Sequence, residues 1–214
     1  MPHVVQPFTN KTFAEAINLL RAAHEFLTAR AKSALQASDA DMACWGIALK
    51  RSSVDLSGDG IPSLIGKTEE KLGEVINIAA TVERLIDAIK WFAEQAEFNV
   101  YTILECHPST SDDFGGNDLV IVDSVGQPAI RCEVCDVASS NAGSNGKEKK
   151  DLSNLGCGDS VPDDGVFRYI CTAPEFADAL VSNARNWNAK PYRYQMTQTG
   201  SLADTRMLRI LPPG

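Results

Sequence analysis

The chain has 214 residues, 44% of them hydrophobic, which is enough for one sizeable core. Its net charge of −8 excludes nonspecific coating of nucleic acid through overall charge, but not a locally basic cleft or a metal ion that bridges carboxylates to phosphate. No apolar run has the length of a membrane span and the N-terminus lacks the features of a signal peptide, so we expect a soluble, cytoplasmic protein with no membrane segment.

The first part of the chain predicts helices. Thr12 and Glu15 form a capping box ahead of apolar residues at helical spacing from Phe13 to Leu35. A shorter helix is expected over 42–49, a Gly/Pro break over 58–66, and a long amphipathic helix from about Thr68 to Gln95. We therefore expect a helical region over residues 1–97, whose amphipathic helices offer a surface for a homo-oligomer or another protein.

The second part predicts a sheet with helical crossovers. Strands are expected over 99–106, 118–123, 129–137, 166–172, 192–197 and 206–211. Helices are expected over 147–155, stopped by Gly156, and over 174–187, which begins with Pro174. This order predicts an α/β (α+β) fold over 98–214, with a mixed central sheet flanked by helices and the helix 68–97 packed into the same compact unit.

Two motifs are weaker than they first look. The stretch GIPSLIGKT (60–68) has five residues between Gly60 and Gly66, where a phosphate-binding P-loop has four. Cys132 and Cys135 form a C-x-x-C, but residues three apart in a strand point to opposite faces. No second ligand pair or helix start accompanies them, so a zinc or redox site is only an alternative interpretation. The six cysteines are expected to be reduced.

Two carboxylates give a different interpretation of the same strand. Asp118 begins one predicted strand and Glu133 lies within the next, with a tight turn at Gly126 between them. Two carboxylates at one sheet edge can hold a hard divalent cation, which activates water and neutralises charge on phosphate. In the alternative interpretation Asp118 caps a turn after residues 115–117 and Glu133 is solvated.

The segment GGNDLVIVDSVGQPAIRCEVCDV, with a helix and a strand before it and again after it, resembles the core of the PD-(D/E)XK nuclease superfamily, the restriction-endonuclease-like fold. That family has an aspartate at the start of its second strand, and an acidic residue and a lysine two apart on the third. Asp118 and Glu133 match the acidic positions, whereas Cys135 stands at the lysine position. The resemblance implies Mg²⁺, for which Mn²⁺ substitutes, and hydrolysis of phosphodiester bonds in DNA in restriction, another defence role or repair.

The resemblance also implies roles for individual residues. Asp118 and Glu133 would bind the metal, with the backbone carbonyl of Cys135 facing it, and Lys147 or Lys150 from the following helix would replace the missing lysine. Glu94 and Glu105 are secondary candidates for a further acidic ligand. The competing hypothesis is a nuclease-like fold without activity that acts as a binding or regulatory partner, which Cys135 and the acidic net charge favour.

Overall fold

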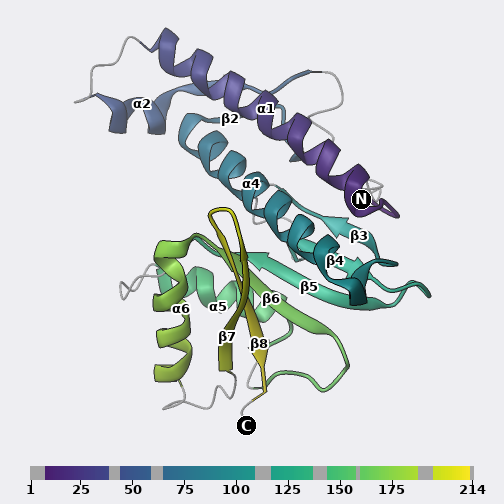
Figure 1. The fold of residues 1–214 in the computed structure, drawn as a ribbon. Coiled ribbons are helices and arrows are strands. Elements are labelled where there is room, and N and C mark those ends of the chain that lie inside the picture. The colour runs from purple at the N-terminus through teal and green to yellow at the C-terminus, as the bar shows by residue number, and fades with distance from the viewer. Residues whose placement is uncertain are drawn as a thin grey trace, which may run out of the picture.

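A computed structural model describes residues 8–38, 44–58, 65–108, 117–136, 144–157, 160–187 and 195–212. The predicted capping box is confirmed, because the Thr12 hydroxyl accepts the Glu15 N–H at 3.3 Å and the Glu15 carboxylate accepts the Thr12 N–H at 2.9 Å. Helix α1 (Phe13–Ala37) follows and runs beside α4 (Leu72–Glu94), with their apolar faces in one core cluster (Figure 1).

The long helix starts later than its hydrophobic pattern predicts. Residues Glu69–Lys71 form strand β2, which pairs antiparallel with β1 (Ser53–Asp55). The pairing continues into the helix start, where the Leu72 N–H donates to the Ser52 carbonyl at 2.9 Å. Ladder bonds to β1 therefore replace the first turn of the expected helix. The short helix α2 (Trp45–Arg51) lies close to its prediction, of which residues 42 and 43 are outside the described part.

A six-stranded mixed sheet forms the rest of the fold, as the order of elements predicts. Strands β3 (Thr102–Cys106), β4 (Leu119–Val122) and β5 (Pro128–Val134) form an antiparallel meander after the short helix η1 (Ala96–Phe98). Helix α5 (Ser144–Asn154) then leads to β6 (Phe167–Thr172), which is parallel to β5. Helix α6 (Pro174–Trp187) and the hairpin of β7 (Gln195–Leu202) and β8 (Thr205–Leu211) complete the order β3-β4-β5-β6-β8-β7. The strand predicted to reach Val137 ends at Val134.

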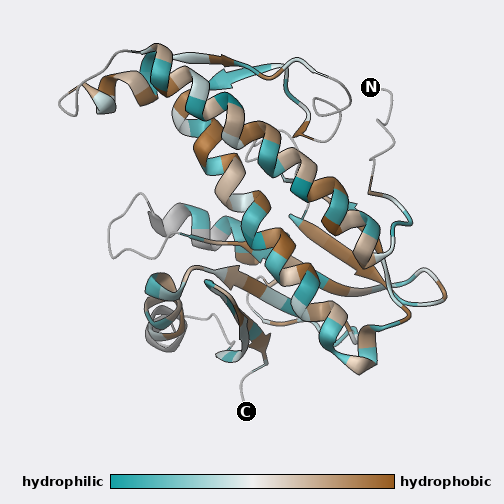
Figure 2. Cartoon of the chain, turned by 45° about the horizontal axis from the view of Figure 1, so that its top comes forward, coloured by the Kyte–Doolittle hydropathy of each residue, from teal (hydrophilic) through white to brown (hydrophobic). Residues whose placement is uncertain are grey.

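The sheet separates two hydrophobic clusters. One joins α1 and α4 to alternate residues of the strands, including Leu119, Cys132 and Tyr169, so the N-terminal helices share their core with the sheet. The other lies under α5 and α6 and contains Cys135 and Ile170. Figure 2 shows hydrophobic residues, in brown, on the strands and along α1 and α4, which lie side by side. No helix in the described ranges is long and apolar enough to cross a lipid bilayer.

A tight turn and a one-residue register shift together set the pairing of the β4–β5 hairpin. The Asp123 side chain accepts the N–H groups of Val125 and Gln127 at 2.9 Å each, and Gly126 has φ +81°. Such a left-handed residue is typical of short hairpin loops. Val122 pairs with Pro128 beside the turn, and a one-residue register shift then pairs Ile121 with Ile130 and Leu119 with Cys132. One further step places Asp118 opposite Glu133.

We expect Gly126→Ala to destabilise the protein by roughly 1–2 kcal/mol, because a left-handed residue with a Cβ is strained. No atom lies within 4 Å of a Cβ built at this position, so the cost comes from the backbone alone. Gly126→Asn is the matched control, because Asn tolerates this conformation better than Ala. Urea unfolding measures both variants, and equal losses would contradict this account of the turn.

Candidate functional site

Asp118 and Glu133 lie opposite each other at one end of the hairpin. Asp118 directly precedes β4, and its Oδ2 accepts the Val134 N–H at 2.7 Å. Glu133 is only 2% exposed, and its Oε1 accepts a hydrogen bond from the side-chain amide of Asn117 at 3.0 Å. Opposite residues of an antiparallel pair present their side chains on the same face. The two carboxylates therefore form a pair on the α5 side of the sheet, and each has one oxygen fixed by a hydrogen bond.

The surroundings of this pair disfavour two bare negative charges. Burial raises the pKa of Asp118, against the opposing effects of the Val134 N–H and the Lys147 charge. Burial and then the Asp118 charge raise the pKa of Glu133, against the hydrogen bond from Asn117. The site therefore favours either a proton on the carboxylate pair or a cation beside it.

Helix α5 brings one lysine to this pair. The Lys147 Nζ donates to the Val134 carbonyl at 3.1 Å and to the two Asp151 carboxylate oxygens at 3.1 and 3.0 Å. Burial acts to lower the pKa of Lys147, but the charges of Asp151, Cys135 and Asp118 outweigh it and raise that pKa. Lys147 is therefore a cation that is bonded to the carbonyl of Val134. Val134 lies between Glu133 and Cys135 in the sequence, and Cys135 stands where the resemblance implies a lysine.

Lys150, the other predicted lysine, has a different position. Its side chain is exposed, although its charge acts to lower the pKa of both Asp118 and Asp151. The Lys147 amino group donates to the β5 backbone, at the Val134 carbonyl.

Cys135 takes a role that the sequence did not predict. Its carbonyl accepts the Thr172 hydroxyl at 2.6 Å and its N–H donates to the Cys171 carbonyl at 3.0 Å. Its thiol is buried in the cluster under α5 and α6 and forms a hydrogen bond with the Asp151 side chain. Cys132 lies in the cluster on the other face, so the two cysteines do not form a C-x-x-C site.

The two secondary acidic candidates, Glu105 and Glu94, lie at different distances from the carboxylate pair. Glu105 pairs with Val120, which is two residues from Asp118 and therefore on the same face of the sheet. Its Oε2 lies 3.6 Å from the Nε2 of His107. Glu105 is thus at the rim of the carboxylate pair. Glu94 is exposed at the end of α4, on the other side of the sheet. The chain continues from there into β3, whose first residue pairs with Val122 at the far end of β4, so Glu94 is not brought to Asp118.

Two residues of this group were missed by the sequence analysis. Asp151 is 3% exposed and pairs with Lys147 one helical turn away, a spacing that could have signalled the pair. Asn117 is also 3% exposed and holds Glu133, with its Oδ1 3.4 Å from an Arg131 nitrogen. No pattern in a single sequence indicates that an asparagine before a strand, such as Asn117, is buried and bonded to a carboxylate.

Asp136 fixes the backbone just beyond the site. Its carboxylate accepts the Ala173 N–H at 2.7 Å and the Arg84 Nε–H at 3.3 Å. Arg84 also donates to the Asp204 carbonyl at 2.8 Å. These bonds join the end of β5 to the start of α6, to α4 and to the β7–β8 turn. The residues that follow Glu133 are therefore held from both faces of the sheet.

The donor set fits a hard divalent cation. Asp118 and Glu133 offer carboxylate oxygens, which Mg²⁺ prefers together with water and phosphate oxygens. Within the described residues, no group of three or more His, Cys, Asp or Glu side chains converges enough to hold an ion by side chains alone. The carboxylate pair therefore suits an ion that takes most of its ligands from water and substrate.

No model of a protein family, no curated protein and no solved structure matches this chain. The geometry of the site and the order of the elements therefore carry the functional argument.

We expect Glu133→Gln to stabilise the metal-free protein more at about pH 8 than at about pH 5. A carboxyl whose pKa is raised on folding holds more protons in the folded state, so its contribution to stability falls as pH rises through its ordinary value of 4.5. The neutral amide does not titrate and so removes this loss, which amounts to on the order of 1–3 kcal/mol in the free energy of unfolding between the two pH values.

Urea unfolding in the presence of a chelator, at several pH values, measures this difference. Glu94→Gln changes an exposed glutamate and is the matched control. A difference between Glu133→Gln and the unmodified protein that does not change with pH would contradict the assignment.

Proposed function

We propose that this protein is a Mg²⁺-dependent deoxyribonuclease of the PD-(D/E)XK type, which hydrolyses phosphodiester bonds in DNA. The observation that carries the proposal is the Lys147 amino group, 3.1 Å from the Val134 carbonyl, beside the facing Asp118 and Glu133. A lysine from α5 thus stands at the stretch of β5 where the resemblance implies one and where the chain has Cys135.

The order of the elements supports the proposal. Helix α4, the meander β3–β4–β5, the crossover α5 and the parallel strand β6 follow the order that the PD-(D/E)XK resemblance implies. The acidic pair lies at the C-terminal end of β5, next to the crossover helix, where side chains of two different elements meet.

Each residue has a role in this proposal. A bound Mg²⁺ ion supplies an activated water and stabilises negative charge on phosphate. Asp118 and Glu133 hold the cation, and the hydrogen bonds from Val134 and Asn117 keep their carboxylates in place. Lys147 orients the attacking water or stabilises the charge that develops on the phosphoryl group, as a positioned cation can.

The proposed partner is DNA and the proposed location is the cytoplasm. All six cysteines are free thiols, and five of them are buried. Free thiols are the usual state of cysteine in a reducing compartment.

We expect the purified protein to nick or linearise plasmid DNA with Mg²⁺ or Mn²⁺. Asp118→Ala, Glu133→Gln and Lys147→Met should each lower the rate by about 10²-fold or more, because each removes a cation ligand or the positioned cation. Gel electrophoresis of a time course measures the rate.

Two matched controls belong in the same series. Glu94→Gln makes the same change as Glu133→Gln at an exposed position, and Lys32→Met makes the same change as Lys147→Met at an exposed position of α1. Both should keep most of the activity. Plasmid traces for Asp118→Ala that match those of the unmodified protein would refute the catalytic proposal.

We expect divalent cations to raise the melting temperature at neutral pH. A ligand that binds only the folded state stabilises by about 2.7 kcal/mol at a hundredfold excess over its dissociation constant. Asp118→Asn should abolish most of this shift, because it removes one of the two carboxylates that face each other. Thermal unfolding with and without Mn²⁺ tests it, and an undiminished shift in Asp118→Asn would place the cation elsewhere.

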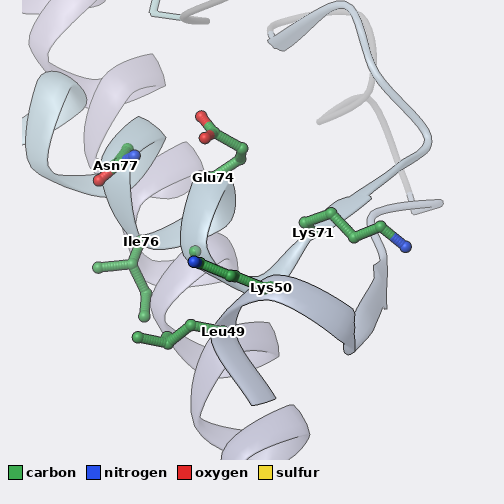
Figure 3. A pocket seen from close by; sticks show the side chains of 7 residues that line it. Leu49, Lys50, Lys71, Glu74, Ile76 and Asn77 are labelled. Atoms are coloured by element: carbon green, nitrogen blue, oxygen red, sulfur yellow. The ribbon is translucent and has the colours of Figure 1, made fainter. Parts of the chain in front are cut away.

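A binding or regulatory partner without activity is the second candidate, and one surface favours it. A pocket between α2, β2 and α4 is lined by Leu49, Lys50, Lys71, Gly73, Glu74, Ile76 and Asn77 (Figure 3). Ile76 at this pocket, and Trp45 and Ile47 on α2, are 39%, 47% and 54% exposed. Exposed apolar side chains on neighbouring elements suit a protein interface, including one between copies of this chain. Absent cleavage together with self-association in sedimentation would favour this candidate.

A further inference from the structure

We propose that Asp151 is a positioning residue, which holds the Lys147 amino group at the Val134 carbonyl with support from the Cys135 thiol. This inference rests on the proposed function for its catalytic consequence. Its geometric part, that Asp151 fixes Lys147, stands independently of any activity.

The contacts of Lys147 are the first step. Its Nζ is 3.1 and 3.0 Å from the two oxygens of Asp151, and 3.1 Å from the Val134 carbonyl. A lysine side chain is long and flexible, so a single bond to a carbonyl holds it weakly. The bidentate contact with Asp151 leaves the amino group few other positions, and the carboxylate is one helical turn from Lys147.

Asp151 is itself held firmly. Its side chain is 4% exposed, while that of Lys147 is 44% exposed. The next turn of α5 anchors it through Leu152 and Leu155, which are buried in the cluster with Cys135. Arg168 donates to the Leu155 carbonyl at 2.7 Å and so fixes the end of the helix. The pair thus has one rigid member, the carboxylate, and one exposed member, the lysine.

The position of Cys135 explains why the lysine comes from a helix. Its small thiol packs under α5 and forms a hydrogen bond with the Asp151 side chain. A lysine in place of Cys135 would add a long cationic side chain at a fully buried site. The thiol therefore leaves room for Asp151 and orients it, and Asp151 in turn orients Lys147.

A role in stability alone fits these contacts poorly. An i,i+4 ion pair with an exposed lysine contributes little to stability. Burying the Asp151 carboxylate is costly. The cost is higher here because the Asp151 charge also acts on Asp118 and Glu133 and raises their pKa values. The pair is therefore better explained by where it places the amino group than by what it adds to folding.

The experiment compares Asp151→Asn with Asp178→Asn, a matched change at an exposed aspartate of α6. Acetylation of lysines by an activated ester, followed by mass spectrometry, measures how accessible the Lys147 amine is in metal-free, DNA-free protein. We expect Lys147 to react roughly tenfold faster in Asp151→Asn, a factor that corresponds to about 1.4 kcal/mol. The lysines other than Lys147 and Lys150 serve as internal references and should react at unchanged rates.

Plasmid cleavage by the same variants gives the second measurement. We expect kcat to fall about tenfold in Asp151→Asn with KM unchanged, and Asp151→Glu to recover part of it, because the lost interaction acts in the transition state. A purely structural Asp151 would lower the melting temperature and leave kcat of the folded variant unchanged. Cys135→Ala, which removes only the thiol, should increase Lys147 reactivity to a smaller degree and replaces Asp151→Asn if that variant fails to fold.

The outcomes separate this inference from the proposed function. An unmodified protein that does not cleave DNA, with Lys147 released in Asp151→Asn, would refute the proposed function and support the positioning of Lys147. An active protein in which Asp151→Asn changes neither Lys147 reactivity nor kcat would overturn the inference and leave the proposed function standing.

Discussion

The register of the β4–β5 hairpin is the constraint on which the candidate site depends. The Asp123 side chain and the left-handed Gly126 close its turn, and a one-residue register shift between Ile121 and Val122 then places Asp118 opposite Glu133. A slip by one residue would turn Glu133 toward α4 and the large apolar cluster, and expose Cys132 on the other face. The turn and the register shift beside it thus determine both the core on one side of the sheet and the carboxylate pair on the other.

The alternation of side chains along β5 decides between a thiol site at Cys132 and Cys135 and a carboxylate site at Glu133. In AIRCEVCDV, Cys132 packs against the α4 side of the sheet and Cys135 against the α5 side, so the thiols are divided between two cores. Glu133 shares its face with Arg131 and lies between the two cysteines in sequence. The cysteine pair is consequently a packing feature, and the buried carboxylate is the group with unusual electrostatics.

Charge balance then links the sheet to helix α5. Asp118, Glu133 and Asp151 bring three carboxyl groups into one electrostatic group, and Lys147 brings the amino group that is bonded there. Burial raises the pKa of Asp118 and Glu133, so this group gains from any further cation. A divalent ion with water and phosphate ligands meets that need, which connects the packing of α5 to the proposed nuclease chemistry.

The sequence by itself determined the class of fold, the order of nearly all elements and the Asp118–Glu133 pair. These features depend on local periodicity, on caps such as Thr12 and on the turn at Gly126, which are all encoded within a few residues. Only the tertiary structure decided the rest. The start of α4 depends on pairing with β1, and the roles of Asp151, Asn117 and Cys135 depend on contacts between separate elements. The position of Lys147 has the same origin, because helical spacing places it near the site and only packing against β5 brings its amino group to the Val134 carbonyl.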